Sequence, residues 1–281
     1  MIETLLGHVR RSETKISISS LAIVLLVFLF SSLAWADNQV AWRQAGLDIE
    51  VGVASIREGL LFPVEVVFVR TSLKRTRVSV VRAAEFGRKT TTAKEMCKER
   101  NALACINANF FDENHDPLGL VVQNGNRFKR PHTGGKTLTG IFLLSRKGPA
   151  IVHRRDVDRL AILEGVQAGP RLVVGGKIAP GTSDSESSSR RSGVCIDQQG
   201  RLVLFAVSAQ FFGVSFGSLA PLLTSPSVQC QDALNLDGGG STQLFVSRDL
   251  PGAVDGFQGV DIPGRDTVPV VLALIPVKPV G

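Results

Sequence analysis

The sequence predicts an α+β fold, a single domain with a large mixed, mostly antiparallel β-sheet flanked by a few helices. Three observations lead to this prediction. Short segments rich in β-branched residues recur along the chain, only two segments carry helix signals, and strands do not alternate regularly with helices as βαβ units would. The composition agrees, because 44% hydrophobic and 20% charged residues are typical of a chain with a sizeable buried core.

The first 36 residues have the parts of a secretory signal. Basic residues precede an apolar run over residues 21–30, and small residues follow at 34–36. An apolar run this short is typical of a cleaved signal, since a membrane-spanning helix needs about 20 residues. Counted across the interspersed serines the apolar segment covers residues 16–33, so an uncleaved anchor is the alternative. We therefore expect residues 37–281 to form the domain, in the periplasm or secreted.

The strands follow from period-two alternation and β-branched runs. Over residues 47–53, for example, apolar odd positions alternate with polar or small even ones, which predicts a half-buried strand. Further strands are expected over residues 64–69, 77–81, 105–106, 118–122, 140–144, 161–166, 193–196, 202–207 and 268–274.

Two helices are expected. Thr92 and Glu95 form a capping box in front of an apolar helical face. A second helix begins near Ser215 or Ser218, with Pro221 confined to its first turns.

The charge argues against a polyanion partner. Lys and Arg number 32 and Asp and Glu 25, which gives +7, but the excess is spread along the chain, with no Tyr and two Trp to interleave with it. A nucleic-acid surface is therefore not expected, and a local anion site suits the charge equally well.

The four cysteines are Cys97, Cys105, Cys195 and Cys230. An even number in an exported chain permits one or two disulfides, with the pairing open, while buried unpaired thiols are the alternative. No pair has C-x-x-C spacing, which argues against a zinc knuckle or a thioredoxin-type site.

Three other segments have a functional and a structural interpretation. Residues 213–217 match G-x-S-x-G, but every histidine precedes Ser215, which is the wrong order for an α/β-hydrolase triad. Residues 112–116 resemble the start of a calcium loop, but Pro117 replaces the required glycine, so a solvated turn is expected. The serine-rich segment 182–191 is either an idle surface loop or a lid over a site.

Residues 236–242 (LDGGGST) are the most informative stretch. Three consecutive glycines directly follow a predicted strand, where they let the backbone approach a ligand closely and can form an anion-binding nest of N–H groups. Because Asp237 stands at the strand end and hydroxyls follow at Ser241 and Thr242, we expect a site here rather than a flexible hairpin turn.

Taken together and in order, these segments resemble the phosphodiester glycosidase family. The resemblance spans roughly residues 103–276. The matching stretches are 106–112 (INANFFD) with 117–120 (PLGL), 168–172 (AGPRL), 191–197 (RSGVCID) with 200–202 (GRL), 233–242 (ALNLDGGGST) and 263–269 (PGRDTVP). The family commonly has Asn-Gly-Gly-Phe-Phe where residues 107–111 are Asn-Ala-Asn-Phe-Phe, so the chain resembles the bacterial exported branch more closely.

The resemblance implies hydrolysis of a sugar-1-phosphodiester at the anomeric carbon, with release of the sugar and a phosphomonoester. In this hypothesis Asp237 activates water or stabilises an oxocarbenium-like transition state, and Asp112 is the second carboxylate, as base or metal ligand. The expected substrate-binding residues are Arg171 or Arg191 with Gly238, Gly239, Gly240 and Ser241 for the phosphate, Asn107 and Asn109 for sugar hydroxyls, and Thr242 beside them.

Two other functions fit the same residues, namely an exported saccharide- or envelope-binding module without turnover and a metal-dependent phosphodiesterase. No cofactor is required, although a calcium or magnesium ion is an alternative that the acidic loop allows. The expected partner is a sugar-phosphodiester small molecule or glycan and not a nucleic acid. A membrane would be contacted only through the N-terminal segment, if that segment is not cleaved.

Overall fold

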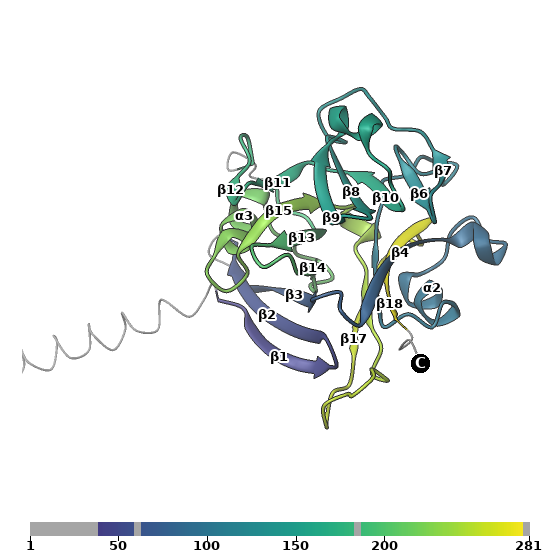
Figure 1. Ribbon diagram of the computed structural model, residues 1–281. Coiled ribbons are helices and arrows are strands. Elements are labelled where there is room, and N and C mark those ends of the chain that lie inside the picture. The colour runs from purple at the N-terminus through teal and green to yellow at the C-terminus, as the bar shows by residue number, and fades with distance from the viewer. Residues whose placement is uncertain (1–38, 59–62, 183–186, 278–281) are drawn as a thin grey trace, which may run out of the picture. The chain divides into compact units, whose positions relative to one another are not determined.

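The computed structural model describes residues 39–58, 63–182 and 187–277 (Figure 1). In these residues β-strands predominate and two α-helices are present, so the predicted α+β class is confirmed. The predicted signal or anchor, residues 1–36, lies outside the described part of the chain. Among the residues that are described, no helix is long and apolar enough to cross a membrane.

The described strands form three sheets rather than one, and their pairings are antiparallel. The first sheet has the order β1 (Ala41–Gly46), β2 (Ile49–Arg57), β3 (Pro63–Thr71), β14 (Leu202–Val207), β13 (Ser192–Asp197), β15 (Cys230–Asn235), β11 (Arg171–Val174), β12 (Lys177–Ile178). The second is β7 (Asn126–Lys129), β6 (Val121–Gln123), β10 (Glu164–Ala168), β8 (Gly140–Ser145), β9 (Gly148–His153). The third is β17 (Val260–Ile262), β16 (Leu244–Val246), β5 (Ala104–Asn107), β18 (Val270–Pro276), β4 (Thr76–Arg82).

The first sheet is buried on both faces. In β3, Val67 and Val69 face a core shared with the second and third sheets, whereas Val66 and Phe68 face a second core. The helix α3 (Phe216–Thr224) covers this second core, and its Leu219 packs there (Figure 1). The period-two alternation of a strand therefore gives each core its own set of side chains.

Both predicted helices are present. The α2 helix (Ala93–Glu99) begins with the predicted capping box, in which the Glu95 N–H donates to Thr92 Oγ1 at 3.1 Å. At the start of α3, Ser215 Oγ accepts the Ser218 N–H at 3.1 Å, and Pro221 lies inside the helix. The serine of the G-x-S-x-G match is therefore a helix N-cap. Short 3₁₀ helices lie at η1 (Ala83–Phe86), η2 (Arg154–Arg159) and η3 (Gly239–Ser241).

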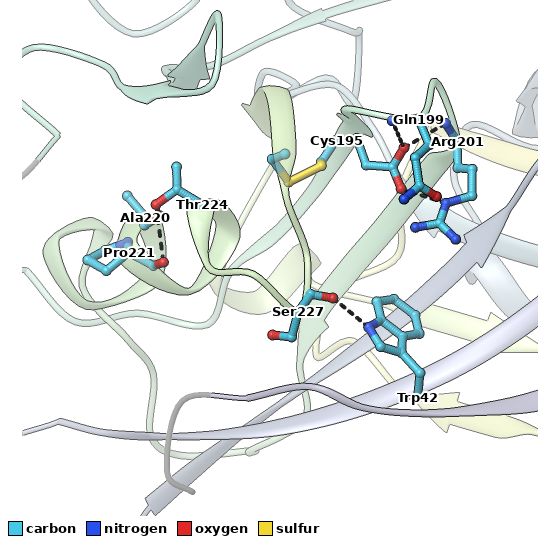
Figure 2. Close-up of a disulfide and its surroundings, with 10 residues drawn as sticks. Trp42, Cys195, Gln199, Arg201, Ala220, Pro221, Thr224 and Ser227 are labelled. Atoms are coloured by element: carbon cyan, nitrogen blue, oxygen red, sulfur yellow. Dashed lines mark hydrogen bonds and ion pairs between the residues drawn. A yellow bond between two sulfur atoms is a disulfide. The ribbon is translucent and has the colours of Figure 1, made fainter. Parts of the chain in front are cut away.

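The four cysteines form two disulfides, which settles the pairing that the sequence left open. Cys97 in α2 is bonded to Cys105 in β5, and Cys195 in β13 is bonded to Cys230 in β15. Figure 2 shows the second disulfide between neighbouring strands, close to Trp42, whose indole N–H donates to the Ser227 carbonyl at 2.7 Å. The first disulfide therefore joins α2 to the third sheet, and the second joins two neighbouring strands of the first sheet.

Candidate functional site

Asp237 lies two residues after the end of β15, where the first and third sheets meet. Its backbone carbonyl accepts hydrogen bonds from Ser192 Oγ at 2.8 Å and from Asn107 Nδ2 at 2.6 Å. Its N–H donates to the Ala108 carbonyl at 3.0 Å. Ser192 begins β13 in the first sheet, while Asn107 ends β5 in the third. The main chain of Asp237 is therefore fixed by both sheets, which is the support that a catalytic carboxylate needs.

The carboxyl group of Asp237 has an unusual environment. Burial raises the pKa of Asp237 to about 6, against hydrogen bonds from the Ser241 hydroxyl and the Gly238 N–H that lower it. The negative charge of Asp266 raises the pKa of Asp237 further. A carboxyl group of this kind exchanges its proton near neutral pH, and such groups are frequent at catalytic sites.

The glycine turn after Asp237 packs too closely for larger residues. A Cβ on Gly238 would lie 2.7 Å from the Arg190 carbonyl oxygen, and a Cβ on Gly240 would overlap the Asp266 carboxylate. Gly239 has φ +60°, a left-handed conformation that favours glycine. The glycines are therefore required for the close approach of two other segments to the turn, and they bring Asp266 beside Asp237.

The N–H groups of this turn are largely used within the protein. The Gly239 N–H donates to the Arg190 carbonyl at 2.9 Å, and the Ser241 N–H donates to the Gly238 carbonyl at 3.1 Å. The Thr242 N–H donates to the Gly239 carbonyl at 3.4 Å. These hydrogen bonds hold Asp237 and its neighbours in place. The N–H groups of Gly239, Ser241 and Thr242 therefore do not form the open anion-binding nest that the sequence suggested.

Asp266 is a site residue that the sequence analysis did not single out. Its N–H donates to the Gly240 carbonyl at 3.1 Å, and its own carbonyl accepts from Gln243 Nε2 at 3.0 Å. Because Gln243 directly follows the LDGGGST stretch, both the N–H and the carbonyl of Asp266 are hydrogen-bonded to residues in or next to that stretch. The only sequence signal was its position inside the last stretch that resembles the family, residues 263–269.

The two asparagines are buried and hold backbone groups. Asn107 Oδ1 accepts the Gln243 N–H at 3.0 Å, so both ends of its amide bind the loop around Asp237. Asn109 Nδ2 donates to the carbonyls of Leu120 at 3.1 Å and Gln167 at 3.0 Å. Asn109 Oδ1 and Thr242 Oγ1 are buried and have no hydrogen-bond partner among the described residues. Asn107 is thus brought to Asp237, while Asn109 joins the second sheet to the loop after β5.

Asp112 serves its own loop. Its Oδ1 accepts the N–H groups of Asn114 and Asp116, both at 2.9 Å, and its N–H donates to the Asp116 carbonyl at 3.0 Å. This arrangement is a side-chain-stabilised turn. Across the described ranges, no group of three or more His, Cys, Asp or Glu side chains is placed to hold a metal ion.

Arg171 and Arg191 lie in different surroundings. The charge of Arg171 acts on His153 and on Asp232, and its side chain packs against Gly140 of the second sheet. Arg191 flanks the glycine turn, since its Cδ lies 4.0 Å from the position that a Cβ on Gly238 would take.

The guanidinium group of Arg191 is engaged by the protein. It stacks over Phe216 at 3.9 Å and donates to the carbonyls of Val214 at 3.2 Å and Ser187 at 2.7 Å. Ser187 and Arg191 both belong to the serine-rich segment 182–191, so this hydrogen bond lies within the segment that the sequence marked as an idle loop or a lid.

Arg190 is the second residue that the sequence analysis missed. Its side chain is 2% exposed, and Nη2 donates to the Pro263 carbonyl at 2.9 Å. Its carbonyl receives the Gly239 N–H, so Arg190 contacts both segments that surround Asp237. The sequence signal for a further candidate was the pair of adjacent arginines, Arg190 and Arg191, in front of β13. Neighbouring residues of an extended chain point to opposite sides, so the two side chains have different surroundings.

The larger described clefts do not include Asp237. One of about 730 Å³ is lined by basic residues such as Arg82, Lys89 and Lys129, and another of about 750 Å³ lies beside α2 and β16. A smaller cavity of about 170 Å³ is lined by Gln243 and Pro263, which both contact site residues. The candidate site is therefore identified by the half-buried Asp237, the neighbouring Asp266 and the buried Arg190, and not by the size of a cleft.

Comparison with known proteins gives a family and a fold. A model of the phosphodiester glycosidase family matches residues 100–274, more than half of the 281 residues. The search of curated proteins found no match.

Two solved structures share the fold. The catalytic domain of zebrafish N-acetylglucosamine-1-phosphodiester alpha-N-acetylglucosaminidase, auto-inhibited by its pro-peptide, has a TM-score of 0.63 and 18% identity over 85% of this chain and 89% of that chain. A hypothetical protein from Synechocystis has a TM-score of 0.59 and 16% identity over 85% of this chain and 64% of that chain.

Proposed function

Since the chain belongs to the phosphodiester glycosidase family, we propose that it hydrolyses a sugar-1-phosphodiester at the anomeric carbon and releases the free sugar and a phosphomonoester. The observation that carries this proposal is the half-buried carboxyl group of Asp237, whose pKa is raised to about 6 at the junction of two sheets. This group matches the chemistry that the reaction requires.

The nature of the leaving group determines whether the reaction needs a general acid, a general base or both. A phosphate ester is a weak base, so the anomeric C–O bond breaks without a strong acid at the leaving oxygen. The oxygen keeps the bonding electron pair and leaves as part of the phosphomonoester. The attacking water forms the new bond to the anomeric carbon and gives its proton to a base. Asp237 in its deprotonated form is the proposed base, and a pKa near 6 lets it act at neutral pH.

Asp266 is the proposed second carboxylate, in place of Asp112. Its charge acts on Asp237, and its carboxylate lies against Gly240, whereas Asp112 binds its own loop. A second negative charge beside Asp237 can stabilise the positive charge that develops on the sugar ring in the transition state. Ser241, which hydrogen-bonds Asp237, orients the base.

The substrate-binding roles of the other residues are also proposals. Asn107 is fully buried and both ends of its amide bind the loop around Asp237, so its proposed role is to position that loop and not to contact a sugar hydroxyl. The buried, unpartnered oxygens of Asn109 and Thr242 are acceptors that a hydroxyl could satisfy.

The test is product analysis in water enriched in oxygen-18. The purified protein is incubated with UDP-N-acetylglucosamine and with methyl-phosphoryl sugars, and the products are identified by mass spectrometry. A glycosidase places the heavy oxygen on the sugar. A metal-dependent phosphodiesterase places it on phosphorus and releases sugar-1-phosphate, and a binding module leaves the substrate unchanged. Either of the last two results would contradict the proposal.

A matched pair of variants ties the activity to the site. Asp237→Asn should lose nearly all of it, whereas Asp249→Asn should retain it, because the Asp249 side chain is 85% exposed and its ion pair is with its neighbour Arg248 at 3.7 Å. Full activity in Asp237→Asn would refute the role of this carboxylate.

We also propose that the protein is exported. Two disulfides within the described residues support an oxidising compartment, where such bonds persist. Cell fractionation checks this proposal, with protein confined to the cytoplasm as the contrary result.

A further inference from the structure

Arg190 combines deep burial with unused hydrogen-bond donors. The side chain is 2% exposed, and one of its donors, Nη2, reaches the Pro263 carbonyl. The other two donor atoms, Nε and Nη1, are buried and have no hydrogen-bond partner among the described residues. A buried donor without a partner costs free energy, and a charged one costs more.

Within the described part of the chain, the charge of Arg190 has no ion-pair partner. The charged group that acts on it is a second cation, Arg265, and together with burial this lowers the pKa of Arg190. Arg265 lies in the same region, because its N–H donates to the Gly240 carbonyl at 2.8 Å. Arg265 Nη2 donates to the Gln210 carbonyl at 2.9 Å, so this donor of the second cation binds a carbonyl and not an acid. Two positive charges thus act on one another near the glycine turn, which makes the place electrostatically suited to an anion.

Arg70 shows how the same fold treats a buried arginine with a structural role. Its side chain donates to Glu50 through two nitrogens, at 2.8 and 2.9 Å, and stacks over Trp42 at 3.8 Å. A fork-like pair of this kind satisfies both the charge and the donors. Arg190 has neither a carboxylate nor an aromatic partner of this kind, so packing alone does not explain it.

We propose that Arg190 is the anion-binding residue of the site, and that it pairs through Nε and Nη1 with the phosphate group of the ligand. Its carbonyl binds Gly239 and its guanidinium binds Pro263, so the residue joins the turn after Asp237 to the segment that carries Asp266. The pairing thereby fixes the phosphate relative to both carboxylates. This inference rests on the proposed function for the identity of the anion.

Arg190 replaces the two arginines that the sequence favoured for this role. Arg191 already donates to two carbonyls and stacks on a ring, and the charge of Arg171 acts on His153 and Asp232. Arg190 also lies one residue before the stretch that resembles the family. Since its two donors are covered by protein atoms, the anion must take the place of those atoms, and binding includes a local movement of the segments that meet at the guanidinium.

The test measures thermal unfolding with inorganic phosphate as the probe, against chloride at equal ionic strength. Phosphate should raise the melting temperature of the wild-type protein by about 3–6 °C at tenfold excess over its dissociation constant. Arg190→Gln should lose this response, with at least a tenfold weaker dissociation constant. Arg190→Lys, which keeps the charge, should retain part of it and guards against a folding defect in the first variant.

Arg70→Gln is the matched control, since it also removes a buried arginine. It should melt at a lower temperature because Glu50 loses its partner, yet it should respond to phosphate like the wild type. Without phosphate, Arg190→Gln should melt no lower than the wild type, because it removes an unpaired buried charge. Equal phosphate responses in Arg190→Gln and wild type, or equal effects of phosphate and chloride on the wild type, would overturn the inference.

Activity separates this inference from the proposed function. Arg190→Gln should raise KM for a sugar-1-phosphodiester at least tenfold, whereas the control Arg70→Gln should leave that KM unchanged, because Arg70 pairs with Glu50 and stacks over Trp42. A phosphate response that depends on Arg190, without turnover of any diester, would sustain the anion site and reject the glycosidase. Turnover with an unchanged KM in Arg190→Gln would do the reverse.

Discussion

Replacing Asp237 by asparagine should stabilise the protein while abolishing its activity. The pKa of Asp237 is raised to about 6, chiefly by burial. This value is about 2 above that of an ordinary aspartate, which corresponds to about 3 kcal/mol. Because the pKa is raised in the folded state, the stabilising contribution is complete below the ordinary pKa and is lost as the pH rises through about 6. Above that pH the folded protein carries a costly buried charge, which asparagine removes.

The assay is urea-induced unfolding at pH 8, 6 and 4 with the disulfides intact. Asp237→Asn should exceed the wild type by about 2–3 kcal/mol at pH 8, after allowance for altered hydrogen bonds, and by less than about 1 kcal/mol at pH 4. Asp249→Asn, at an exposed position, should match the wild type at every pH. A stability difference that does not change with pH, or a less stable Asp237→Asn at pH 8, would refute the conclusion that burial raises the pKa of Asp237.

Three further predictions follow from the same geometry. The kcat/KM of the wild type should rise with pH through about 6, and Asp266→Asn should move this inflection lower, because the charge of Asp266 raises the pKa of Asp237; an unmoved inflection would contradict the coupling. Gly240→Ala should cost about 1–3 kcal/mol in urea unfolding and reduce activity, since the new Cβ overlaps the Asp266 carboxylate, and wild-type behaviour would count against the tight turn. Replacing the disulfide of Cys195 and Cys230, separated by 35 residues, should lower the unfolding free energy by about 4 kcal/mol on the chain-entropy account, and a loss near zero would show that the unfolded chain is not what the bridge restrains.

Local features of the fold were predictable because they depend on neighbouring residues. The capping box of Thr92 and Glu95 starts a helix in the structure as the sequence indicated, since both partners lie within one turn. The alternation in β3 likewise places Val67 and Phe68 in different cores. The division of the strands into three sheets was not predictable, because it depends on pairings such as β16 with β5, which are distant in sequence.

The site was predictable where a motif lies on one continuous stretch. Asp237 and the glycines after it could be singled out from strand, carboxylate and turn in a row. Asp266 could not, because only the fold brings it against Gly240. The choice between Arg190 and Arg191 was likewise beyond the sequence, since adjacent arginines have the same chemistry and differ only in which side of the chain they face.

The unusual groups of the site argue together for a ligand. Asp237 is a half-buried acid with a raised pKa, and Arg190 is a buried cation with a lowered pKa. If their role were structural, the simplest arrangement would pair them with one another and satisfy both. Instead, no donor of the Arg190 guanidinium binds Asp237 among the described residues, although the Arg190 carbonyl accepts the Gly239 N–H of the turn that follows Asp237. A fold that holds an acid and a cation close but unpaired keeps each free for a third group, and a sugar phosphate offers a site of attack to the first and a negative charge to the second.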